Sequence, residues 1–369
     1  MKPFVPEKLP ISDVDWASLI TFIGKANRCL TFYDGVLYGV PNSEVLLAPL
    51  TTQEAVLSSR IEGTQANLEE VLKFEAGEVI GEDSRREDIQ EIINYRKSLR
   101  QAEEMLKTKP FCLNTLLELH TVLLDSVRGF NKGRGKFRTV QNWVGKPGTP
   151  VEQAEFVPPD PLHLMEYLGD WEKYYHFEDR DPLVQLAIIH AQFEIIHPFL
   201  DGNGRIGRML IPLFLFEKKL LDRPRFYLSE YLEGHRDEYV LHLRELGQPG
   251  SWDRWIKFFL TAVAVQAQSN STKAKNIQDL YDNLKTQVIQ LTRSQYAVPL
   301  LDRIFERPVF RSSDLTSRKD MPSVPMVLSM LNSLKKAGVL KVVREGAGSR
   351  AQILALAELI NLCEGKPVL

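Results

Sequence analysis

Cysteine is scarce in this sequence, and long uncharged apolar stretches are missing from it. The 369 residues include three scattered cysteines, Cys29, Cys112 and Cys363, which lack the spacing of a metal site. No apolar run reaches the roughly 20 residues that a membrane span needs, and the first residues lack the apolar centre of a signal peptide. We therefore expect a soluble, cytoplasmic protein with no membrane partner.

The sequence also has little excess of either charge. It contains 46 basic and 48 acidic residues, for a formal net charge of −2. This balance argues against a general polyanion-binding surface but leaves room for a local basic patch. A chain of this length can hold two or three domains with sizeable cores.

The densest group of chemically useful side chains is the stretch HPFLDGNGRIGR at residues 197–208. Upstream, Asp181 can cap a helix that has Pro182 at its first position, and apolar residues then recur at helical spacing. Pro198 disfavours helix at His197, so this helix should end there. Apolar residues downstream predict a second, central helix, namely Ile206, Met209, Leu210, Leu213 and Leu220.

The loop between the two predicted helices suits a phosphate group. A glycine-rich loop that opens a helix presents unpaired backbone N–H groups and the positive end of the helix dipole. Gly202 and Gly204 permit close approach of a ligand, and Asn203 tolerates left-handed geometry and can donate from its amide. Arg205 and Arg208 share one face of the helix, and two guanidinium groups favour a polyphosphate.

Two further residues add a metal ion and a base. Asp201 would repel phosphates unless a cation intervened, so Mg²⁺ is implied. His197 could take a proton from an incoming hydroxyl group. An alternative is a zinc site, because His190, Glu194 and His197 have the i, i+4, i+7 spacing of ligands on one helix face. Pro198 should pull His197 off that helix, so we interpret His190 as a hydrogen-bonded core histidine.

The stretch resembles the HPFx[D/E]GNGRxxR signature of Fic-domain proteins, which mostly transfer AMP from ATP to a protein hydroxyl. The resemblance extends over roughly residues 55–260. It implies that His197 is the general base and that Asp201 holds Mg²⁺. It also implies that the ATP phosphates are bound by Gly202, Asn203, Gly204, Arg205 and Arg208. The alternative is a glycine-rich turn between helices with surface arginines.

A second short motif lies upstream. Thr51 or Thr52 can cap a helix that Gly63 would end, and Ser58 and Glu62 are four apart and share one face of it. The segment resembles the [S/T]xxxE[G/N] inhibitory motif of Fic proteins that carry their own autoinhibitory helix. This resemblance implies that Ser58 and Glu62 belong to an inhibitory helix. A solvated helix end is the alternative.

Two more predictions concern the walls of the expected site. Apolar residues up to Val144, a turn at Pro147 and Gly148 and a return strand at Phe156 predict a β-hairpin. It resembles the Fic flap, here about residues 137–157, to which a target protein adds a strand; an ordinary surface hairpin is the alternative.

Adenine recognition is expected further along the chain. In related Fic proteins a tyrosine in about this place packs on the adenine, and Tyr239 is the best match, with core packing as the alternative. The asparagine that often follows is not evident, because Gly247 lies near that place.

The predicted fold is mainly α, a Fic helical core with a β-hairpin flap. We expect a helical region with the inhibitory helix (1–110), the catalytic core (111–265), a connecting helix (266–291) and a last domain (292–369). Residues 266–276 could be a linker or the start of that helix. The last segment resembles a winged helix-turn-helix domain. DNA would meet its third helix and wing, with phosphate contacts from Lys335, Lys336, Arg344 and Arg350. Protein contacts are the alternative.

These predictions describe a protein adenylyltransferase that transfers AMP from ATP to Tyr, Ser or Thr hydroxyls of target proteins and of itself. The reaction would use Mg²⁺, and Glu62 would inhibit it. Targets at the flap, a second copy in a homodimer, and DNA are the expected macromolecular partners. One alternative is a DNA-binding regulator or toxin–antitoxin-like protein whose Fic core senses nucleotides. Another is a Fic enzyme that transfers a different group or removes AMP.

Overall fold

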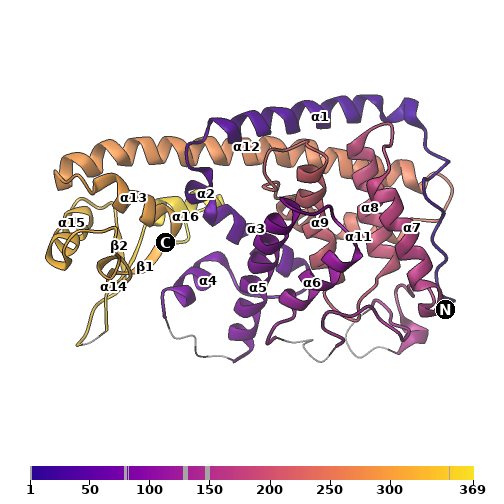
Figure 1. Cartoon of the computed structure of the whole chain (residues 1–369), viewed down its shortest axis with the longest axis horizontal. Coiled ribbons are helices and arrows are strands. Elements are labelled where there is room, and N and C mark those ends of the chain that lie inside the picture. The colour runs from indigo at the N-terminus through magenta and orange to yellow at the C-terminus, as the bar shows by residue number, and fades with distance from the viewer. Residues whose placement is uncertain (1, 79–80, 82, 128–131, 146–149, 349) are drawn as a thin grey trace. The chain divides into compact units, whose positions relative to one another are not determined.

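The computed structural model describes residues 2–78, 81, 83–127, 132–145, 150–348 and 350–369, which are mainly helical with a small sheet (Figure 1). The chain divides into two compact units. The first holds residues 1–34, 57–63 and 94–268, and the second holds residues 35–56, 64–93 and 269–369. Residues of both units belong to helices α1 (Trp16–Gly39), α3 (Ala48–Ile61), α5 (Asp83–Leu106) and α12 (Ser251–Thr292). Among the described residues, no helix combines the length and the apolar character that a membrane crossing requires.

The first unit is built around α8 (Pro182–Ile196), which packs between α7 (Leu164–His176) and α9 (Asn203–Glu217), as Figure 1 shows. Nearly every residue of α8 and α9 is buried, which explains why both helices are apolar on most sides. The other elements of this unit are α6 (Leu113–Leu123), the 3₁₀ helices η1 (Val151–Gln153) and η2 (Pro161–His163), α10 (Ser229–Gly234) and α11 (Arg236–Glu245).

The two central helices begin and end where local chemistry requires. Asp181 Oδ1 accepts hydrogen bonds from the N–H groups of Leu183 and Val184, at 2.9 and 3.1 Å, and so caps α8. His197 closes α8 in the left-handed region, with φ 49°, and Pro198 prevents further helix. Gly202, with φ 82°, precedes α9. The predicted order of helix, glycine-rich loop and helix is confirmed.

Two helices differ from the sequence-based expectation. Helix α3 begins at Ala48, so Thr51 and Thr52 lie inside it and do not cap it. Helix α12 runs without a break through residues 266–276, where a linker was one of the two expectations. The polar side chains of that stretch make internal contacts: Gln266 is 2% exposed and donates to Glu230 Oε2 at 2.8 Å. The residues of this stretch are polar because their side chains form buried hydrogen bonds, and not because the stretch is a flexible linker.

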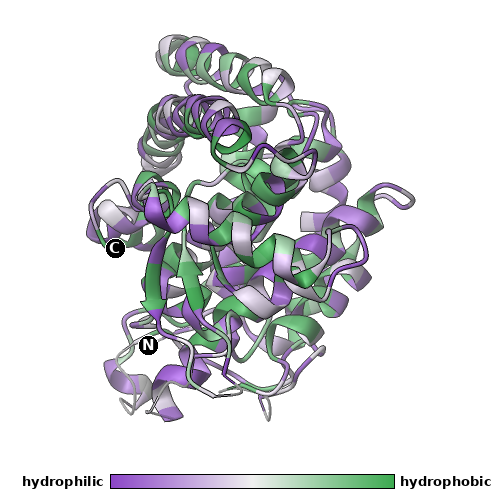
Figure 2. Cartoon of the chain, turned by 90° about the vertical axis from the view of Figure 1, so that its left-hand side faces the viewer, coloured by the Kyte–Doolittle hydropathy of each residue, from purple (hydrophilic) through white to green (hydrophobic). Residues whose placement is uncertain are grey.

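The second unit contains a three-stranded antiparallel sheet in the order β1–β3–β2. Its elements are α2 (Ser43–Leu46), α4 (Leu68–Glu75), α13 (Ala297–Glu306), β1 (Val309–Arg311), α14 (Ser312–Thr316), α15 (Val324–Lys336), β2 (Lys341–Arg344), β3 (Ile353–Ala355) and α16 (Ala357–Glu364). Strand β3 is fully buried, and Figure 2 colours the strands mainly as hydrophobic. Helix α13 packs against α2, and α4 packs against β1 and α16.

The expected flap is less regular than predicted. The prediction of two strands is wrong for the described residues between 132 and 160. These residues contain a single antiparallel bridge, between Val144 and Phe156. The Val144 N–H donates to the Phe156 carbonyl at 2.8 Å, and the Val144 carbonyl accepts from Phe156 at 3.2 Å. Pro158 and Pro159 follow after Val157 and offer no N–H, which limits further pairing. The turn predicted at Pro147 and Gly148 lies outside the described residues.

Candidate active site

His197 is held at the end of α8 in a form that suits a base. Its Nδ1 atom lies 3.2 Å from the carbonyl oxygen of Glu194, which can only accept, so Nδ1 carries the proton and Nε2 keeps a lone pair. Burial lowers the pKa of the imidazole to about 4. The ring is therefore neutral at pH 7 and able to accept a proton.

Arg138 fixes the backbone around His197. Its Nε donates to the His197 carbonyl at 2.9 Å, and its Nη2 donates to the carbonyls of Ile196 and Pro159 at 3.3 and 2.6 Å. The side chain thereby satisfies carbonyl groups at the C-terminus of α8, where a positive charge is also favourable. Burial lowers the pKa of Arg138 to about 10, so it stays charged at neutral pH. The sequence analysis missed this residue, because its partners are up to 59 positions away.

The glycine-rich loop is stabilised by hydrogen bonds between its own residues. Asn203 Oδ1 accepts from the Phe199 N–H and Asn203 Nδ2 donates to the Phe199 carbonyl, both at 2.8 Å. Phe199 is buried and stacks on the ring of His120, with centroids 3.9 Å apart. The Asn203 amide therefore serves the loop, which leaves its backbone N–H as the group that an anion could use.

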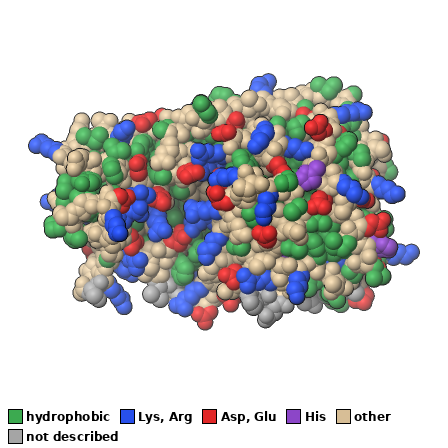
Figure 3. Space-filling view, in the orientation of Figure 1, with side chains coloured by type: hydrophobic (Ala, Val, Ile, Leu, Met, Phe, Trp, Pro, Cys, Tyr) green, Lys and Arg blue, Asp and Glu red, His purple; other side chains and the backbone are tan. Residues whose placement is uncertain are grey.

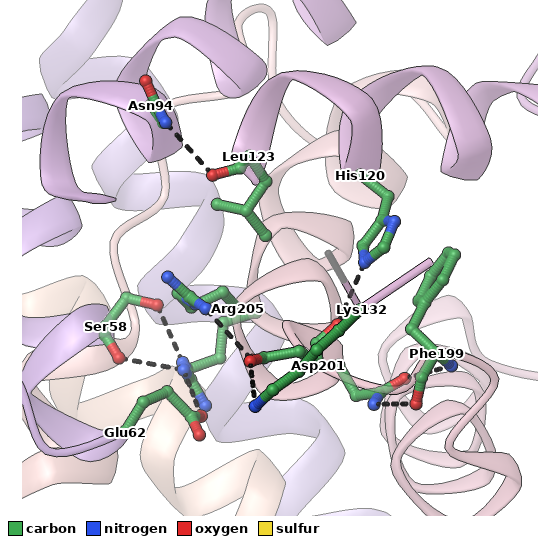
Figure 4. Close-up of polar contacts among 11 residues, drawn as sticks. Ser58, Glu62, Asn94, His120, Leu123, Lys132, Phe199, Asp201 and Arg205 are labelled. Atoms are coloured by element: carbon green, nitrogen blue, oxygen red, sulfur yellow. Dashed lines mark hydrogen bonds and ion pairs between the residues drawn. The ribbon is translucent and has the colours of Figure 1, made fainter. Parts of the chain in front are cut away.

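Asp201 lies among cationic side chains (Figure 4). Its Oδ2 is 3.0 Å from Lys132 Nζ and its Oδ1 is 3.4 Å from Arg205 Nη2. The Nδ1 atom of His120 accepts from the Gly135 N–H at 2.9 Å, so Nε2 carries the proton that is donated to the Asp201 carbonyl at 3.0 Å. His120 is a second residue that the sequence analysis missed, and it orients Asp201.

The donor set around Asp201 limits which metal could bind. In the part of the chain that the structure describes, no group of three or more His, Cys, Asp or Glu side chains is arranged to hold a metal ion. Magnesium ions are commonly held by one or two carboxylates together with substrate phosphates and water, so the single Asp201 carboxylate fits such an ion.

His190 is a hydrogen-bonded core histidine, as expected. Its Nδ1 lies 3.0 Å from the Gly207 carbonyl and its Nε2 lies 2.9 Å from the hydroxyl oxygen of Tyr239. Both ring nitrogens are engaged, and burial lowers the pKa to about 3, so the ring is neutral. Tyr239 is 3% exposed and its ring centroid lies 5.9 Å from that of Trp255. Tyr239 is thus packed in the core, although it also borders the cavity described below.

The guanidinium group of Arg208 is bound by Ser58, near the end of α3, and by Glu62, just beyond it. Figure 4 labels these two partners. The Arg208 Nε donates to Ser58 Oγ at 2.8 Å, and its Nη2 donates to the Ser58 carbonyl at 2.9 Å and to Glu62 Oε1 at 2.7 Å. Desolvation acts to raise the pKa of Glu62, but the charge of Arg208 and its hydrogen bond, together with the charge of Arg205, hold the pKa below its usual value. Glu62 is therefore ionised at neutral pH.

Gly204 allows Glu62 to approach the first turn of α9. A Cβ atom at this position would lie 2.2 Å from Glu62 Oε1 and 2.9 Å from Arg208 Nη1. Only glycine leaves space for the carboxylate there. The end of α9 that favours anions is thus already in contact with a carboxylate of the same chain.

These groups meet in one cavity of about 180 Å³. Its polar lining comes from Glu62, Glu194, His197, Gly204, Arg208, Arg236 and Arg244, and its apolar lining from Ile61, Val144, Phe156, Ile195, Tyr239, Val240 and Leu243. A neutral base, a guanidinium group and a helix N-terminus thus share a space with an apolar wall. Such a space suits a ligand that has both phosphates and an aromatic base.

Described residues of the expected flap contact the N-terminal residues of the first unit and helix α11. The Phe4 N–H donates to the Val157 carbonyl at 2.9 Å, and the Phe4 ring lies 5.6 Å from the ring of Phe156. Glu155 forms an ion pair with Arg244 of α11. The N-terminal arm (residues 2–10) thus covers one side of the segment that borders the cavity.

Comparison with known proteins agrees with this geometry. Residues 20–104 match the family model described as Fic/DOC family N-terminal, and residues 110–215 match the Fic/DOC family model. The protein adenylyltransferase fic-1 of Caenorhabditis elegans is 32% identical over 204 residues, which are 53% of this chain and 37% of that protein. A probable protein adenylyltransferase of Aquifex aeolicus is 27% identical over 227 residues, 58% of this chain and 60% of its own length. The chain therefore spans less than two thirds of these relatives.

Solved structures agree in fold. A Fic family protein from Desulfovibrio desulfuricans G20 superposes with a TM-score of 0.57 at 18% identity, over 96% of this chain and 98% of that one. Fic-1 from C. elegans superposes with a TM-score of 0.54 at 23% identity, over 71% of this chain and 74% of that one. The family models, the motif and the fold lead to the same assignment: the chain belongs to the Fic/DOC family.

Proposed function

We propose that the protein transfers AMP from ATP to a hydroxyl group of a protein and that Glu62 inhibits this reaction in cis. The observation that carries the proposal is the cavity that a neutral His197 shares with Arg208 and the glycine-rich start of α9. The names of the relatives, which are protein adenylyltransferases, support it.

In the proposed reaction, the N–H groups at residues 202–204 bind the phosphates of ATP, with Arg205 and Arg208 on the outer phosphates. Nε2 of His197 takes the proton of a Tyr, Ser or Thr hydroxyl group. The hydroxyl oxygen forms a bond to the α-phosphorus, the bond between that phosphorus and the pyrophosphate oxygen breaks, and pyrophosphate leaves. Asp201 would hold Mg²⁺, which supplies neutralising charge on the phosphates.

The contact between Glu62 and Arg208 is the basis of the proposed inhibition. A guanidinium group that already binds Ser58 and Glu62 is not available to an outer phosphate of ATP. ATP would then bind in a pose in which the α-phosphate is displaced from His197. A misplacement of about 1 Å can slow a reaction by about 10²-fold, because reacting atoms must be aligned.

The test is labelling of proteins in a cell lysate by ATP that carries the label on the α-phosphate. We expect Glu62→Gly to label target proteins and itself, and expect the same chain with His197→Ala to lose about 10²–10⁴-fold of that activity. Labelling by ATP that carries the label on the γ-phosphate should not rise above the background that the His197→Ala variant gives in the same lysate, which separates AMP transfer from phosphate transfer. The proposal is contradicted if labelling above that background comes from γ-labelled ATP, if it comes only from α-labelled UTP, or if α-labelled ATP gives none.

We also propose that residues 292–369 form a winged helix that contacts protein. The order α13, β1, α14, α15, β2, β3 and the sheet order β1–β3–β2 support the winged-helix fold. On α15, Val324, Met326 and Leu328 are 49%, 38% and 40% exposed, which suits a protein partner better than base edges. Figure 3 shows basic and acidic side chains interspersed on the face that it draws. Salt-sensitive retention of the full chain on duplex DNA would favour the DNA alternative.

A further inference from the structure

Both carboxylate oxygens of Asp201 face a cationic side chain, and the two side chains differ in exposure (Figure 4). Oδ1 lies 3.4 Å from Nη2 of Arg205, whose side chain is 5% exposed. Oδ2 lies 3.0 Å from Nζ of Lys132, whose side chain is 59% exposed. A buried guanidinium group is held by its surroundings, whereas an exposed lysine can turn into solvent at little cost. Oδ2 is therefore the oxygen that another cation can reach by displacing the ammonium group of Lys132.

The backbone next to Lys132 is fixed, although the lysine side chain is exposed. Arg134 Nε donates to the Thr121 carbonyl of α6 at 2.6 Å, and the Gly135 N–H donates to His120 Nδ1 at 2.9 Å. Gly135 has φ 69°, and a Cβ atom there would lie 2.3 Å from Thr121 Oγ1. The segment can approach α6 this closely because the residue is glycine. These contacts hold the segment against α6.

His120 connects this segment to Asp201. The ring that accepts from Gly135 through Nδ1 donates through Nε2 to the Asp201 carbonyl at 3.0 Å. The backbones on both sides of the ion pair are thus linked to one imidazole. A tethered group acts on its partner at a high effective concentration, because it cannot diffuse away. The ammonium group of Lys132 therefore stays available to Asp201 even when its side chain turns.

The ion pair between Lys132 and Asp201 contributes more to the charge of the site than to the stability of the fold. Pairs between exposed side chains stabilise a protein little, and the Asp201 side chain is itself 25% exposed. An unpaired carboxylate beside the start of α9 would repel phosphates. Lys132 and Arg205 supply the positive charge that prevents this repulsion before any metal ion binds. A metal ion that enters the site must then compete with Lys132.

We propose that Lys132 competes with the metal ion for Oδ2 of Asp201 and thereby lowers the affinity of the site for Mg²⁺. This inference rests on the proposed function, because it assumes that Asp201 holds the metal ion beside the phosphates of ATP. The ammonium group and a divalent cation exclude one another at Oδ2, since two cations at one oxygen repel each other. By the same linkage, metal binding releases Lys132 from Asp201.

The test measures binding of Mn²⁺, whose free form is detected by electron paramagnetic resonance. The parent is the full chain with Glu62→Gly, which leaves Arg208 available for a nucleotide. It is kept in excess over α,β-methylene-ATP, which cannot be cleaved between its α- and β-phosphates. We expect added Lys132→Met to bind Mn²⁺ at least about threefold more tightly, which is the scale of a partly exposed ion pair. Lys132→Arg keeps the charge and should stay within about twofold of the parent.

Two controls locate the effect. Lys136→Met removes the same charge from an exposed position of the same segment and should leave the Mn²⁺ affinity within about twofold of the parent. Asp201→Asn should weaken Mn²⁺ binding by at least about tenfold, because the ion loses a charged ligand. Thermal melting checks that each variant is folded, and Lys132→Gln serves as a second neutral variant.

The inference is overturned if neither neutral variant of Lys132 binds Mn²⁺ more tightly than the parent. It is also overturned if Lys136→Met tightens binding as much as Lys132→Met does, or if Asp201→Asn binds Mn²⁺ as the parent does. Any of these results from a parent that transfers AMP from α-labelled ATP would refute the inference alone. A parent that binds no nucleotide would refute the proposed function as well.

Discussion

Oε1 of Glu62 lies 2.7 Å from Nη2 of Arg208, while Oγ of Ser58 accepts from Nε of the same guanidinium at 2.8 Å. Two residues of one short segment, 57–63, therefore bind Arg208, which lies 150 positions after Ser58 in the chain. The arginine is 2% exposed, and the Glu62 side chain is 40% exposed. An ATP phosphate that needs this arginine would have to displace Glu62 and could leave Ser58 in place.

Replacing Glu62 by glycine should release the arginine. We expect AMP transfer by Glu62→Gly to be at least tenfold faster than that of the wild type, because ATP can then adopt an aligned pose. Arg208→Ala removes the same ion pair but also the phosphate ligand, so it should not increase the rate. Initial rates with α-labelled ATP measure all three proteins. A folded Glu62→Gly that is no faster than the wild type would refute the inhibitory role.

The pH dependence of transfer should report the shifted imidazole. Burial lowers the pKa of His197 to about 4, so the neutral base is present above that pH and is lost only as the pH falls through it. The transfer rate of Glu62→Gly should therefore not fall as the pH drops through about 6.5, the usual pKa of a histidine. The pKa of Glu62 is also lowered, so the wild type should stay inhibited from neutral pH down into the acid range. Rate profiles of both proteins between about pH 5 and 8 test this. An acid limb near 6.5 would mean that His197 is not the base or is not buried during the reaction.

Arg138 should matter for both stability and rate. Arg138→Met removes the side-chain donor of the Ile196 and Pro159 carbonyls and the nearer of two side-chain donors of the His197 carbonyl, and each buried group left unsatisfied costs about 1–3 kcal/mol. We expect a lower melting temperature and a fall in kcat that exceeds any change in ATP affinity, because the base is displaced while the phosphate site is intact. Lys136→Met, at an exposed position nearby, is the control. Equal kcat values for the two variants would show that Arg138 does not position His197.

Gly204→Ala should close the anion site. Its Cβ atom would stand 2.2 Å from Glu62 Oε1 and 2.9 Å from Arg208 Nη1, where a phosphate would also approach. We therefore expect weaker ATP binding without activation, even though Glu62 is displaced. Gly169→Ala within α7 meets no atom within 4 Å and should stabilise the helix by up to about 1 kcal/mol. Calorimetric binding and melting temperatures compare the two, and unchanged ATP affinity in Gly204→Ala would contradict the prediction.

Removal of residues 292–369 should destabilise the part of the chain that remains. Within the second unit, α13 packs against α2, and β1 and α16 pack against α4. Their loss exposes apolar side chains of the shorter helices, such as Leu46, Leu68 and Val71, which are buried in the whole chain. We expect a lower melting temperature or aggregation of residues 1–291, measured by scanning calorimetry and light scattering. A monomeric fragment as stable as the full chain would contradict this.

Local signals were sufficient to predict the centre of the site. The Asp181 cap, Pro182 and Pro198 set the ends of α8, and the glycines mark the loop, because each acts through its own backbone or its nearest neighbours. The likeness of this stretch to the Fic signature then supplied roles for the side chains. A resemblance to a second Fic motif, and not helical periodicity, gave the expectation that Ser58 and Glu62 belong to an inhibitory helix.

The parts that were missed depend on distant partners. Arg138 and His120 look unremarkable in the sequence, since their partners are up to 59 and 81 positions away. The flap was predicted as two strands because β propensity describes residues and not the pairing that they find. The Oε1 atom of Glu194 is notable only because nothing pairs with it, and a missing partner has no sequence signal.

The N-terminal arm has a consequence for the order of folding. Its contacts join Phe4 to Val157, and Glu7 to Gln192 and Trp252, over separations of up to 245 residues. Closing loops of this length costs entropy, and no local structure forms in return. During synthesis on a ribosome, the arm emerges before α8 and α12 and must therefore wait for both helices before it can dock. We expect the arm to be among the last segments to gain protection from hydrogen exchange, together with the edge of the cavity that it covers.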